Sequence, residues 1–436
     1  MVRTIDLRGR TLDTAELLEA VPRATAARDE ALATAARIVH DVAERGEEAL
    51  REQAAQFDRV EGHAVRVPAE HLDEALTTLD ADVRAALDEA IRRVSAASAA
   101  QVPPARVTTL GDGARVEQLW RPVQRVGVYV PGGKAVYPSS VVMNVVPAQV
   151  AGVAQIALAS PPQAAFGGRV HPVILAAARL LGIAEVYAMG GAGAIGAYAY
   201  GVPGIALERV DVISGPGNNF VALAKRVVAG VVGTDSEAGA TEILVVADAS
   251  ADPDWVAADL VSQAEHDEQA AAVLVTPSEA LAVAVAERVA VRAAQTRHAD
   301  RIAQALAGPQ SAIVLVDDIP AATAFSNAYA PEHLELHLAD PRVDDFVNAG
   351  AVFVGAHSPV SLGDYLAGSN HVLPTGGQAR YASGLSASSF LRPQQVISYD
   401  RAALDAVRPE ILALAAAEAL PAHGEAVTAR FAQGGA

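Results

Sequence analysis

The chain contains no cysteine among its 436 residues, which excludes a disulfide framework, a thiolate nucleophile and a cysteine-type zinc site. Any bound metal ion must therefore be held by histidine, carboxylate or amide oxygen. Aromatic residues are also scarce, at 4% of the chain, whereas 51% of the residues are hydrophobic, mostly alanine and valine. This composition suits packed α/β layers and argues against disorder.

Positively charged residues are fewer than negatively charged ones. The chain has 33 Lys and Arg against 51 Asp and Glu, for a formal net charge of −18, which would repel nucleic acids and anionic membranes at long range. We therefore expect a small-molecule ligand in a local pocket. No apolar run approaches ~18 residues, and the N-terminus lacks the apolar region of a signal peptide. We expect a soluble, cytoplasmic protein with two or three domains.

Hydrophobic periodicity divides the chain into regions. A helical pattern runs from Ala24 to about Ala100, and from 126 onward short apolar runs alternate with helical segments. Short buried strands that alternate with helices predict parallel sheets covered on both faces, so we expect two doubly wound units joined near residue 240. The expected strands are 126–130, 156–160, 185–189 and 210–214 in the first unit, and 242–248, 271–276, 311–318 and 351–357 in the second.

Glycine-rich turns follow three strands of the first doubly wound region. Gly191–Gly196 reads G-x-G-x-x-G between a strand and a helix, as in dinucleotide-binding proteins; close helix–strand packing through small residues is the alternative. Ser214–Asn219 and Pro131–Gly133, the latter preceded by Tyr129, are the other two turns. Backbone N–H groups at such turns can hold phosphate, and three turns at the carboxyl ends of one sheet indicate a nucleotide crevice.

Polar residues that could take part in catalysis or bind a metal recur in the second doubly wound region. Gln263 and His266 are three apart on a predicted helix and project from one face, so an amide oxygen and an imidazole there can share a metal ion. The alternative is that both are solvated or capping residues. Glu332 and His333 place an acid beside a base at the start of a strand-like run, and Asp364 lies in a glycine-rich polar loop. We expect these groups to converge at the carboxyl ends of the parallel strands.

Further polar residues lie toward the C-terminus. Glu418 and His423 form a pair in the final segment, where a charged helix end is the alternative interpretation. His357 and His371 lie close in sequence to Asp364, and either a supporting role beside the site or simple packing remains open for them.

Several long ungapped strings resemble the histidinol dehydrogenase family, in the same order over nearly the whole chain. They are VGVYVPGGKAVYPSSVVMNVVPAQVAGV, SGPGNNF, SQAEHDE, APEHLEL, SLGDYLAGSNHVLPT and EALPAHGEAV. The resemblance implies a zinc-dependent enzyme that oxidises L-histidinol to L-histidine, passing two hydrides to two NAD⁺ through enzyme-bound histidinal in the last steps of histidine biosynthesis.

The resemblance also implies roles for individual residues. Glu332 and His333 would be the catalytic pair. One Zn²⁺ per subunit would be held by Gln263, His266, Asp364 and His423. NAD⁺ would contact Tyr129, Gly193 and Asn218. The substrate would contact Thr241, Gln263, His266, His333, Asp364, Glu418 and His423.

The same resemblance implies a homodimer in which each active site borrows the other subunit's tail. The expected fold is α/β, with two Rossmann-like doubly wound domains, one inserted in the other. Residues 22–128 and 241–388 would carry most metal and catalytic residues, and 129–240 would be the inserted NAD-binding domain. A short N-terminal arm (1–21) and a helical C-terminal tail (389–436) would complete the chain.

Two departures and two alternatives accompany this hypothesis. Gly193 stands where the family usually has a cofactor-contacting Gln, and Ala240 interrupts the usual Gly-Pro-Ser/Thr-Glu string. A related dehydrogenase of another diol, such as a sulfonated propanediol, is one alternative; an anionic substrate would favour Arg or Lys, whereas the tail offers Glu418. The other alternative is a non-catalytic nucleotide-binding α/β protein.

Overall fold

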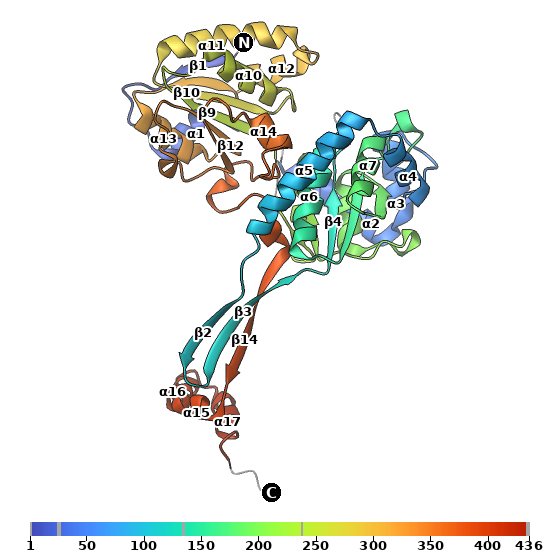
Figure 1. The fold of residues 1–436 in the computed structure, drawn as a ribbon, viewed down its shortest axis with the longest axis vertical. Coiled ribbons are helices and arrows are strands. Elements are labelled where there is room, and N and C mark those ends of the chain that lie inside the picture. Colours follow the sequence, from blue (N-terminus) through green and yellow to red (C-terminus); the bar gives the residue numbers. More distant parts are fainter. Residues whose placement is uncertain (1, 24–27, 133–135, 237–238, 433–436) are drawn as a thin grey trace. The chain divides into compact units, whose positions relative to one another are not determined.

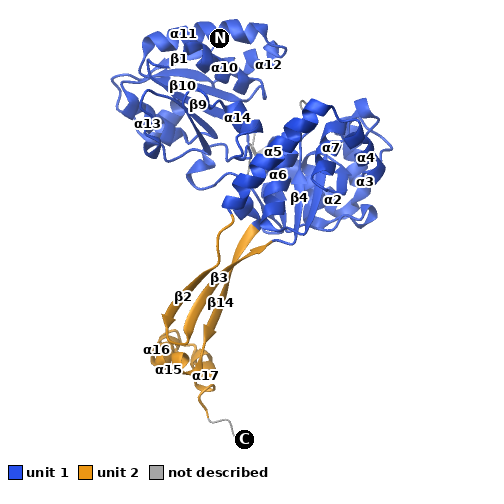
Figure 2. Ribbon diagram, viewed as in Figure 1, with its two compact units in different colours: residues 1–101, 123–390 blue, residues 102–122, 391–436 orange. Residues whose placement is uncertain are grey.

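A computed structural model describes residues 2–23, 28–132, 136–236 and 239–432 (Figure 1). Gly133, part of the first expected glycine turn, lies outside the described residues. The chain divides into two compact units, residues 1–101 with 123–390 and residues 102–122 with 391–436 (Figure 2). No helix among the described residues combines the length and apolarity needed to cross a membrane.

The first unit contains a six-stranded sheet, here called sheet A, in the order β1-β11-β10-β9-β12-β13 with every pairing parallel. Uninterrupted Val, Ile, Leu and Ala runs suit its central strands because helices cover both faces. Helices α10, α11 and α12 cover one face, where α14 also packs, and α1 and α13 cover the other (Figure 1). The strands are β1 (Arg3–Asp6), β9 (Glu242–Ala247), β10 (Ala271–Thr276), β11 (Ala312–Leu315), β12 (His333–His337) and β13 (Ala351–Val354). The helices are α1 (Thr14–Ala20), α10 (Pro253–Ala264), α11 (Glu279–Gln295), α12 (Ala299–Ala307), α13 (Ile319–Tyr329) and α14 (Val360–Tyr365).

The first unit also contains a five-stranded parallel sheet, sheet B, in the order β6-β5-β4-β7-β8. Numbered along the chain this order is 3-2-1-4-5, the Rossmann arrangement, and strands β11-β10-β9-β12-β13 of sheet A repeat it. The strands are β4 (Arg125–Tyr129), β5 (Gln155–Ser160), β6 (Glu185–Ala188), β7 (Val212–Ser214) and β8 (Gly233–Thr234). The helices after them are α6 (Pro138–Ala151), α7 (Pro172–Leu180), α8 (Gly191–Tyr200) and α9 (Asn219–Val228).

The N-terminal segments do not follow the division expected from the sequence. Strand β1 pairs with β11 and α1 packs on α13, so the expected arm is part of sheet A. The next helices pack on the helices of sheet B: α2 contacts α8 and α9, α4 contacts α7, and α5 contacts α6. Amphipathic helices can cover either sheet, so periodicity alone does not decide between them. These helices are α2 (Arg28–Arg45), α3 (Glu47–Gln53), α4 (Ala69–Thr77) and α5 (Ala81–Ala100).

The second unit is a three-stranded antiparallel sheet followed by short helices. Its strands are β2 (Arg106–Gly111), β3 (Ala114–Pro122) and β14 (Leu391–Tyr399), in the order β14-β3-β2. The expectation that the tail is helical throughout is wrong for β14, which pairs with β3 along its full length. Because β14 is mostly exposed, it lacks the alternation that marks a half-buried strand. Helices α15 (Arg401–Ala406), α16 (Arg408–Ala417) and α17 (Pro421–Thr428) follow.

Single helical turns connect several of these elements. A π-helical turn spans Ala54–Asp58, and 3₁₀ turns span Ala164–Phe166, Pro203–Ile205, Val343–Asp345, Gln378–Arg380 and Ala387–Phe390.

Candidate active site

Gln263 lies in the last turn of α10 with a carboxamide oxygen that has no partner. Asp252 caps the start of this helix, and apolar residues such as Leu260 hold it on sheet A. The side-chain Nε2 of Gln263 donates to Thr241 Oγ1 at 2.8 Å, whereas Oε1 is buried and accepts no hydrogen bond. An orphaned buried oxygen is uncommon and calls for a donor or a cation. This oxygen therefore fits a metal-binding role.

His266 and Asp364 face each other beside the end of α10. The Nδ1 of His266 lies 3.3 Å from the carbonyl oxygen of Gln263; an N–H there leaves Nε2 with a free lone pair, which is how metal-binding imidazoles are usually oriented. Nε2 lies 4.0 Å from Asp364 Oδ2. An imidazole nitrogen, a carboxylate oxygen and an amide oxygen form a donor set that suits Zn²⁺, Co²⁺ or Mn²⁺.

His371 supports the segment that carries Asp364. Its Nδ1 lies 3.0 Å from the carbonyl oxygen of Asp364 and its Nε2 lies 3.0 Å from Ser140 Oγ. Burial lowers the pKa of this imidazole, opposed by the Asp364 carboxylate. His357, by contrast, is exposed and lies against Trp255, with ring centroids 5.9 Å apart. His371 therefore lies where it can support the site, whereas His357 packs on the surface.

Glu332 and His333 form a buried acid–base pair at the start of β12. The two side chains are 8% and 6% exposed, and Glu332 Oε2 lies 3.5 Å from His333 Nδ1. Nδ1 lies 3.0 Å from the carbonyl oxygen of Glu242, which leaves Nε2 available as a base when Nδ1 carries the proton. Burial raises the pKa of the Glu332 carboxyl, although His333, Thr241 and the Glu242 N–H oppose this shift.

Thr241 connects the two groups. Its hydroxyl accepts from Gln263 Nε2 and donates to Glu332 Oε2 at 2.6 Å, and Glu332 Oε2 also accepts the Glu242 N–H at 2.9 Å. One hydroxyl therefore fixes the orientation of a metal-type donor and of the buried acid. A shift in either residue is transmitted to the other through two short hydrogen bonds.

These groups converge at the amino ends of the strands of sheet A, not at the carboxyl ends as expected. Thr241 precedes β9 and His333 begins β12, and the register pairs His333 with Ile243 of β9 and Ala351 of β13. Helix α10 runs back across the sheet, so its last turn, with Gln263, returns to the same edge. The expectation was wrong because the rule that ligands bind at the carboxyl ends of strands applies to loops that follow strands, whereas Thr241 and Glu332 precede theirs.

The three expected cofactor residues lie around sheet B. Its strand order reverses between β4 and β7, and nucleotides bind at such switch points. Tyr129 ends β4, its hydroxyl accepts the Gly191 N–H at 3.1 Å, and burial raises its pKa to about 12. Asn218 follows β7 and caps α9, accepting from the N–H groups of Phe220 and Val221.

A tightly packed glycine and two unpartnered serine hydroxyls lie at this edge. Gly215 has φ +121°, and a Cβ there would lie 2.0 Å from the Tyr129 carbonyl oxygen, so only glycine fits. The hydroxyl oxygens of Ser160 and Ser214, at the ends of β5 and β7, are buried without a partner. Orphaned donors beside a switch point fit a dinucleotide. Gly193, however, packs tightly: a Cβ there would lie 2.0 Å from Gln53 Oε1.

A buried ion pair secures the same turn. Lys225 is 1% exposed, and its Nζ donates to the Gly215 carbonyl at 2.6 Å and to Asp235 at 2.5 Å. The other carboxylate oxygen of Asp235 accepts the Gly215 N–H at 2.8 Å. Both backbone groups of Gly215 are thus held. The residues were missed because a lysine within an apolar helix ordinarily indicates a solvated position.

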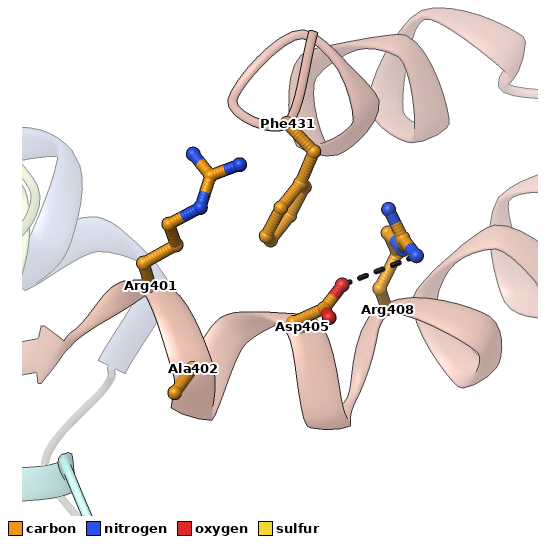
Figure 3. Close-up of a pocket in the computed structure, with 5 residues that line it drawn as sticks. All are labelled: Arg401, Ala402, Asp405, Arg408 and Phe431. Carbon is orange, nitrogen blue, oxygen red and sulfur yellow. Dashed lines mark ion pairs between the residues drawn. The ribbon is translucent and has the colours of Figure 1, made fainter. Parts of the chain in front are cut away.

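The structure brings together Thr241, Gln263, His266, Glu332, His333 and Asp364 on the first unit. Glu418 and His423 belong to the second unit, where both are exposed: Glu418 ends α16 and His423 lies in α17. The second unit also has a pocket lined by Arg401, Ala402, Asp405, Arg408 and Phe431 (Figure 3), which contains none of the expected site residues. There the two arginines lie over the ring of Phe431 at 4.9 and 4.7 Å, which holds the end of the chain on α15 and α16.

A second polar group lies deeper in sheet A. The ligand atoms of Asp259, Glu335 and His337 lie within 4.8 Å of one another, so these side chains could share a cation or a proton. Burial and the Glu335 carboxylate raise the pKa of Asp259 to about 7. The sequence analysis missed this group, although the alternation of His333, Glu335 and His337 along one strand places all three on one face.

The chain is similar to known proteins over nearly its whole length. Residues 21–431 match the model of the histidinol dehydrogenase family. A histidinol dehydrogenase of Leifsonia xyli subsp. xyli is 63% identical over 432 residues, covering 99% of both chains. One of Mycobacterium tuberculosis is 57% identical over 432 residues, covering 98% of this chain and 97% of the relative. The crystal structure of histidinol dehydrogenase from Elizabethkingia anophelis has a TM-score of 0.92 at 33% identity and covers 99% of this chain and 98% of that one.

The fold and these matches define the class first: the protein is an oxidoreductase, a dehydrogenase built on parallel α/β sheets. The identity and coverage then specify the family within that class. The chain belongs to the histidinol dehydrogenase family.

Proposed function

We propose that this cytoplasmic enzyme oxidises L-histidinol to L-histidine, with two hydride transfers to two NAD⁺, in the last steps of histidine biosynthesis. Family membership supplies the substrate. The observation that carries the proposal is the Thr241 bridge, which joins an unpartnered metal-type donor, Gln263, to the Glu332–His333 pair. A dehydrogenase that retains an aldehyde between two steps needs binding and proton-transfer groups in one buried place.

His333 is the general base of this proposal. Its Nδ1 faces the Glu242 carbonyl, so Nε2 can take the proton of the substrate hydroxyl as hydride leaves the carbon. Glu332 would activate the water that adds to the intermediate aldehyde, and His333 would then act again. NAD⁺, when bound, accepts each hydride, while the protein provides position and charge. The raised pKa of Glu332 suits a carboxylate that must exchange a proton.

We assign the metal to Gln263, His266 and Asp364 of one subunit, with His423 as the fourth ligand, and Zn²⁺ at one per subunit as the ion. The unpartnered oxygen of Gln263 and the facing His266 and Asp364 support this assignment. When bound, such an ion would orient the substrate imidazole and amine as a template. Thr241 and Glu418 would contact the substrate as well, Glu418 through a cationic group.

NAD⁺ is assigned to the switch point of sheet B. Tyr129 and Asn218 flank it from β4 and β7, and unpartnered Ser160 and Ser214 hydroxyls support the assignment. Gly193 remains the third proposed contact, through its backbone. Because α2, α4 and α5 pack on the helices of sheet B, we assign residues 28–101 and 123–236 to the NAD-binding domain.

We further propose a homodimer in which the tail of each subunit completes the site of the other. Glu418 and His423 are exposed on a unit with short helices and a three-stranded sheet whose two outer strands are mostly exposed, and such a unit has little core of its own. The test mixes His423→Ala with His333→Ala chains. Activity recovered in verified mixed dimers supports shared sites, and its absence contradicts them.

The main experiment measures NADH formed per substrate. Two equivalents per L-histidinol, lost on chelation and restored by Zn²⁺, are expected. One equivalent, or turnover with another diol alone, would reject the assignment in favour of a related dehydrogenase. Complete absence of bound metal after expression with Zn²⁺ would favour a non-catalytic nucleotide-binding protein.

A further inference from the structure

The short helix that carries Asp364 begins without a cap of its own. Helix α14 spans Val360–Tyr365, and its N-cap residue, Pro359, has no side chain that can accept a hydrogen bond. The first N–H groups of a helix lack partners within the helix and need them from elsewhere. In this protein the Val360 N–H donates to Glu335 Oε1 at 2.8 Å. The cap therefore comes from a strand far away in sequence.

Glu335 is placed to connect the two halves of the proposed site. It lies in β12, two residues after His333, so both side chains lie on the face that α10 and α14 cover. Its backbone continues the strand that carries the catalytic pair, and its carboxylate holds the start of the helix that carries Asp364. The side chain is 1% exposed, so water does not compete for this hydrogen bond.

The carboxylate of Glu335 is itself fixed in place. Its Oε2 lies 3.4 Å from His337 Nε2, which lies 3.8 Å from Asp259 Oδ2. Burial alone would lower the pKa of His337, but the Glu335 hydrogen bond and the two carboxylates outweigh it and raise the pKa. The His337 imidazole thus lies between two acidic side chains that both favour its protonated form. Oε1 is left to accept the Val360 N–H.

The rest of α14 is held as closely. Gly363 sits directly on Phe353 of β13, where a Cβ would come within 2.6 Å of the ring. The same ring lies 6.0 Å from that of His333. At the far end, the Asp364 carbonyl oxygen faces His371 Nδ1. The cap from Glu335 at the start of α14 is thus one of three contacts that together hold the helix carrying Asp364.

We propose that Glu335 is a positioning residue: by capping α14 from the catalytic strand, it sets the place of Asp364 relative to His266 and the Glu332–His333 pair. This inference rests on the metal site proposed above. A group that orients a metal ligand typically contributes ~10- to 100-fold to metal affinity or activity. Glu335 would do so without touching metal, substrate or cofactor.

The experiment compares three variants with the unaltered full-length protein. Glu335→Ala removes the acceptor, Glu335→Gln keeps an oxygen at its place, and Val360→Pro removes the donor. Proline suits the first position of a helix, and Pro359, with ψ 155°, already has the extended backbone required before proline. Ser278→Ala is the matched control, because Ser278 caps α11 in the same layer and α11 carries no proposed site residue.

The measurements are the dissociation constant for Zn²⁺, by chelator competition, and deuterium uptake of residues 358–366 in metal-free protein. Glu335→Ala and Val360→Pro should weaken Zn²⁺ binding ~10- to 100-fold and speed uptake at α14. A variant that combines Glu335→Ala with Val360→Pro should bind Zn²⁺ no more weakly than either single variant, because the two substitutions remove the same interaction. Glu335→Gln should stay within about threefold, and Ser278→Ala should change stability without changing affinity.

Two results would overturn the proposal. One is unchanged Zn²⁺ affinity in a folded Glu335→Ala or Val360→Pro protein. The other is additive loss in the double variant, which would show that the two residues act independently. If the unaltered protein bound no Zn²⁺, the metal assignment would fall, and unchanged uptake at α14 in Val360→Pro would then reject the cap as well. Should Glu335→Ala fail to fold, Val360→Pro and Glu335→Gln give the same comparison.

Discussion

Replacing Thr241 by valine should break the hydrogen-bonded link between Gln263, the proposed metal ligand, and Glu332. The substitution keeps the branched shape and removes the hydroxyl, which accepts from Gln263 Nε2 at 2.8 Å and donates to Glu332 Oε2 at 2.6 Å. Losing one of these partly buried hydrogen bonds costs about 1–2 kcal/mol, so the two together are worth about 2–4 kcal/mol. At about 1.4 kcal/mol per tenfold, kcat/KM for L-histidinol should fall roughly 30- to 700-fold if the loss falls on the transition state.

The pH profile of the same variant gives a second measure. The Thr241 hydroxyl opposes the rise that burial imposes on the pKa of Glu332. Without it that pKa rises further. If ionised Glu332 activates water, the acid limb of the kcat/KM profile should move to higher pH. The assay is NADH formation across pH with L-histidinol as substrate.

Thr276→Val is the matched control for this experiment. Thr276 is a buried threonine at the end of β10, and its hydroxyl accepts the Ser278 N–H at 3.0 Å, away from the site. It should lose stability by about 1 kcal/mol and keep its kcat/KM. A Thr241→Val enzyme with kcat/KM within threefold of the unaltered protein, and an unmoved acid limb, would refute the bridging role.

Three further substitutions test other parts of the structure. Gly215→Ala should raise the KM for NAD⁺ more than that for L-histidinol and lower the melting temperature, because its Cβ would meet the Tyr129 carbonyl at 2.0 Å; equal changes in both KM values would contradict this. Lys225→Met should lower the free energy of unfolding by about 3–5 kcal/mol by leaving Asp235 buried and unpaired, and a loss below 1 kcal/mol in urea unfolding would count against it. Burial raises the pKa of Glu332 above its pKa in the unfolded chain. Metal-free protein should therefore lose stability as pH rises from the unfolded pKa to the raised folded pKa, and Glu332→Gln should abolish this part of the pH dependence. Unfolding at several pH values decides the matter, and an identical dependence in the variant would be the contrary result.

Much of the architecture follows from the sequence. Strands rich in Val, Ile and Ala between helical segments predict parallel sheets, and the expected runs at 242–248 and 271–276 contain β9 and β10. The resemblance specified the family, which the comparisons confirm. Periodicity did not reveal β14 or the β2–β3 hairpin, because β2 and β14 are mostly exposed and β3 is mostly half-buried, so none has a buried face that produces an alternating pattern.

The sequence predicted several residues that the structure brings together, but not where in the fold they meet. Spacing predicted that Gln263 and His266 share a helix face, but α10 ends at Ala264, so His266 lies beyond the helix. Adjacency predicted the Glu332–His333 pair. Their location at the amino edge of sheet A depends on strand register and on the direction in which α10 crosses the sheet. The capping of α14 by Glu335 joins residues 25 positions apart. Such a contact depends on tertiary packing and leaves no local signal.

The central claim is that Gln263, His266 and Asp364 hold the metal beside the Glu332–His333 pair. A crystal structure with Zn²⁺ and L-histidinol tests it most directly. The account predicts one ion per subunit in contact with Gln263 Oε1, His266 Nε2 and the Asp364 carboxylate, together with His423 of the partner subunit. An ion held instead by Asp259, Glu335 and His337, with Gln263 Oε1 still unpartnered, would contradict it.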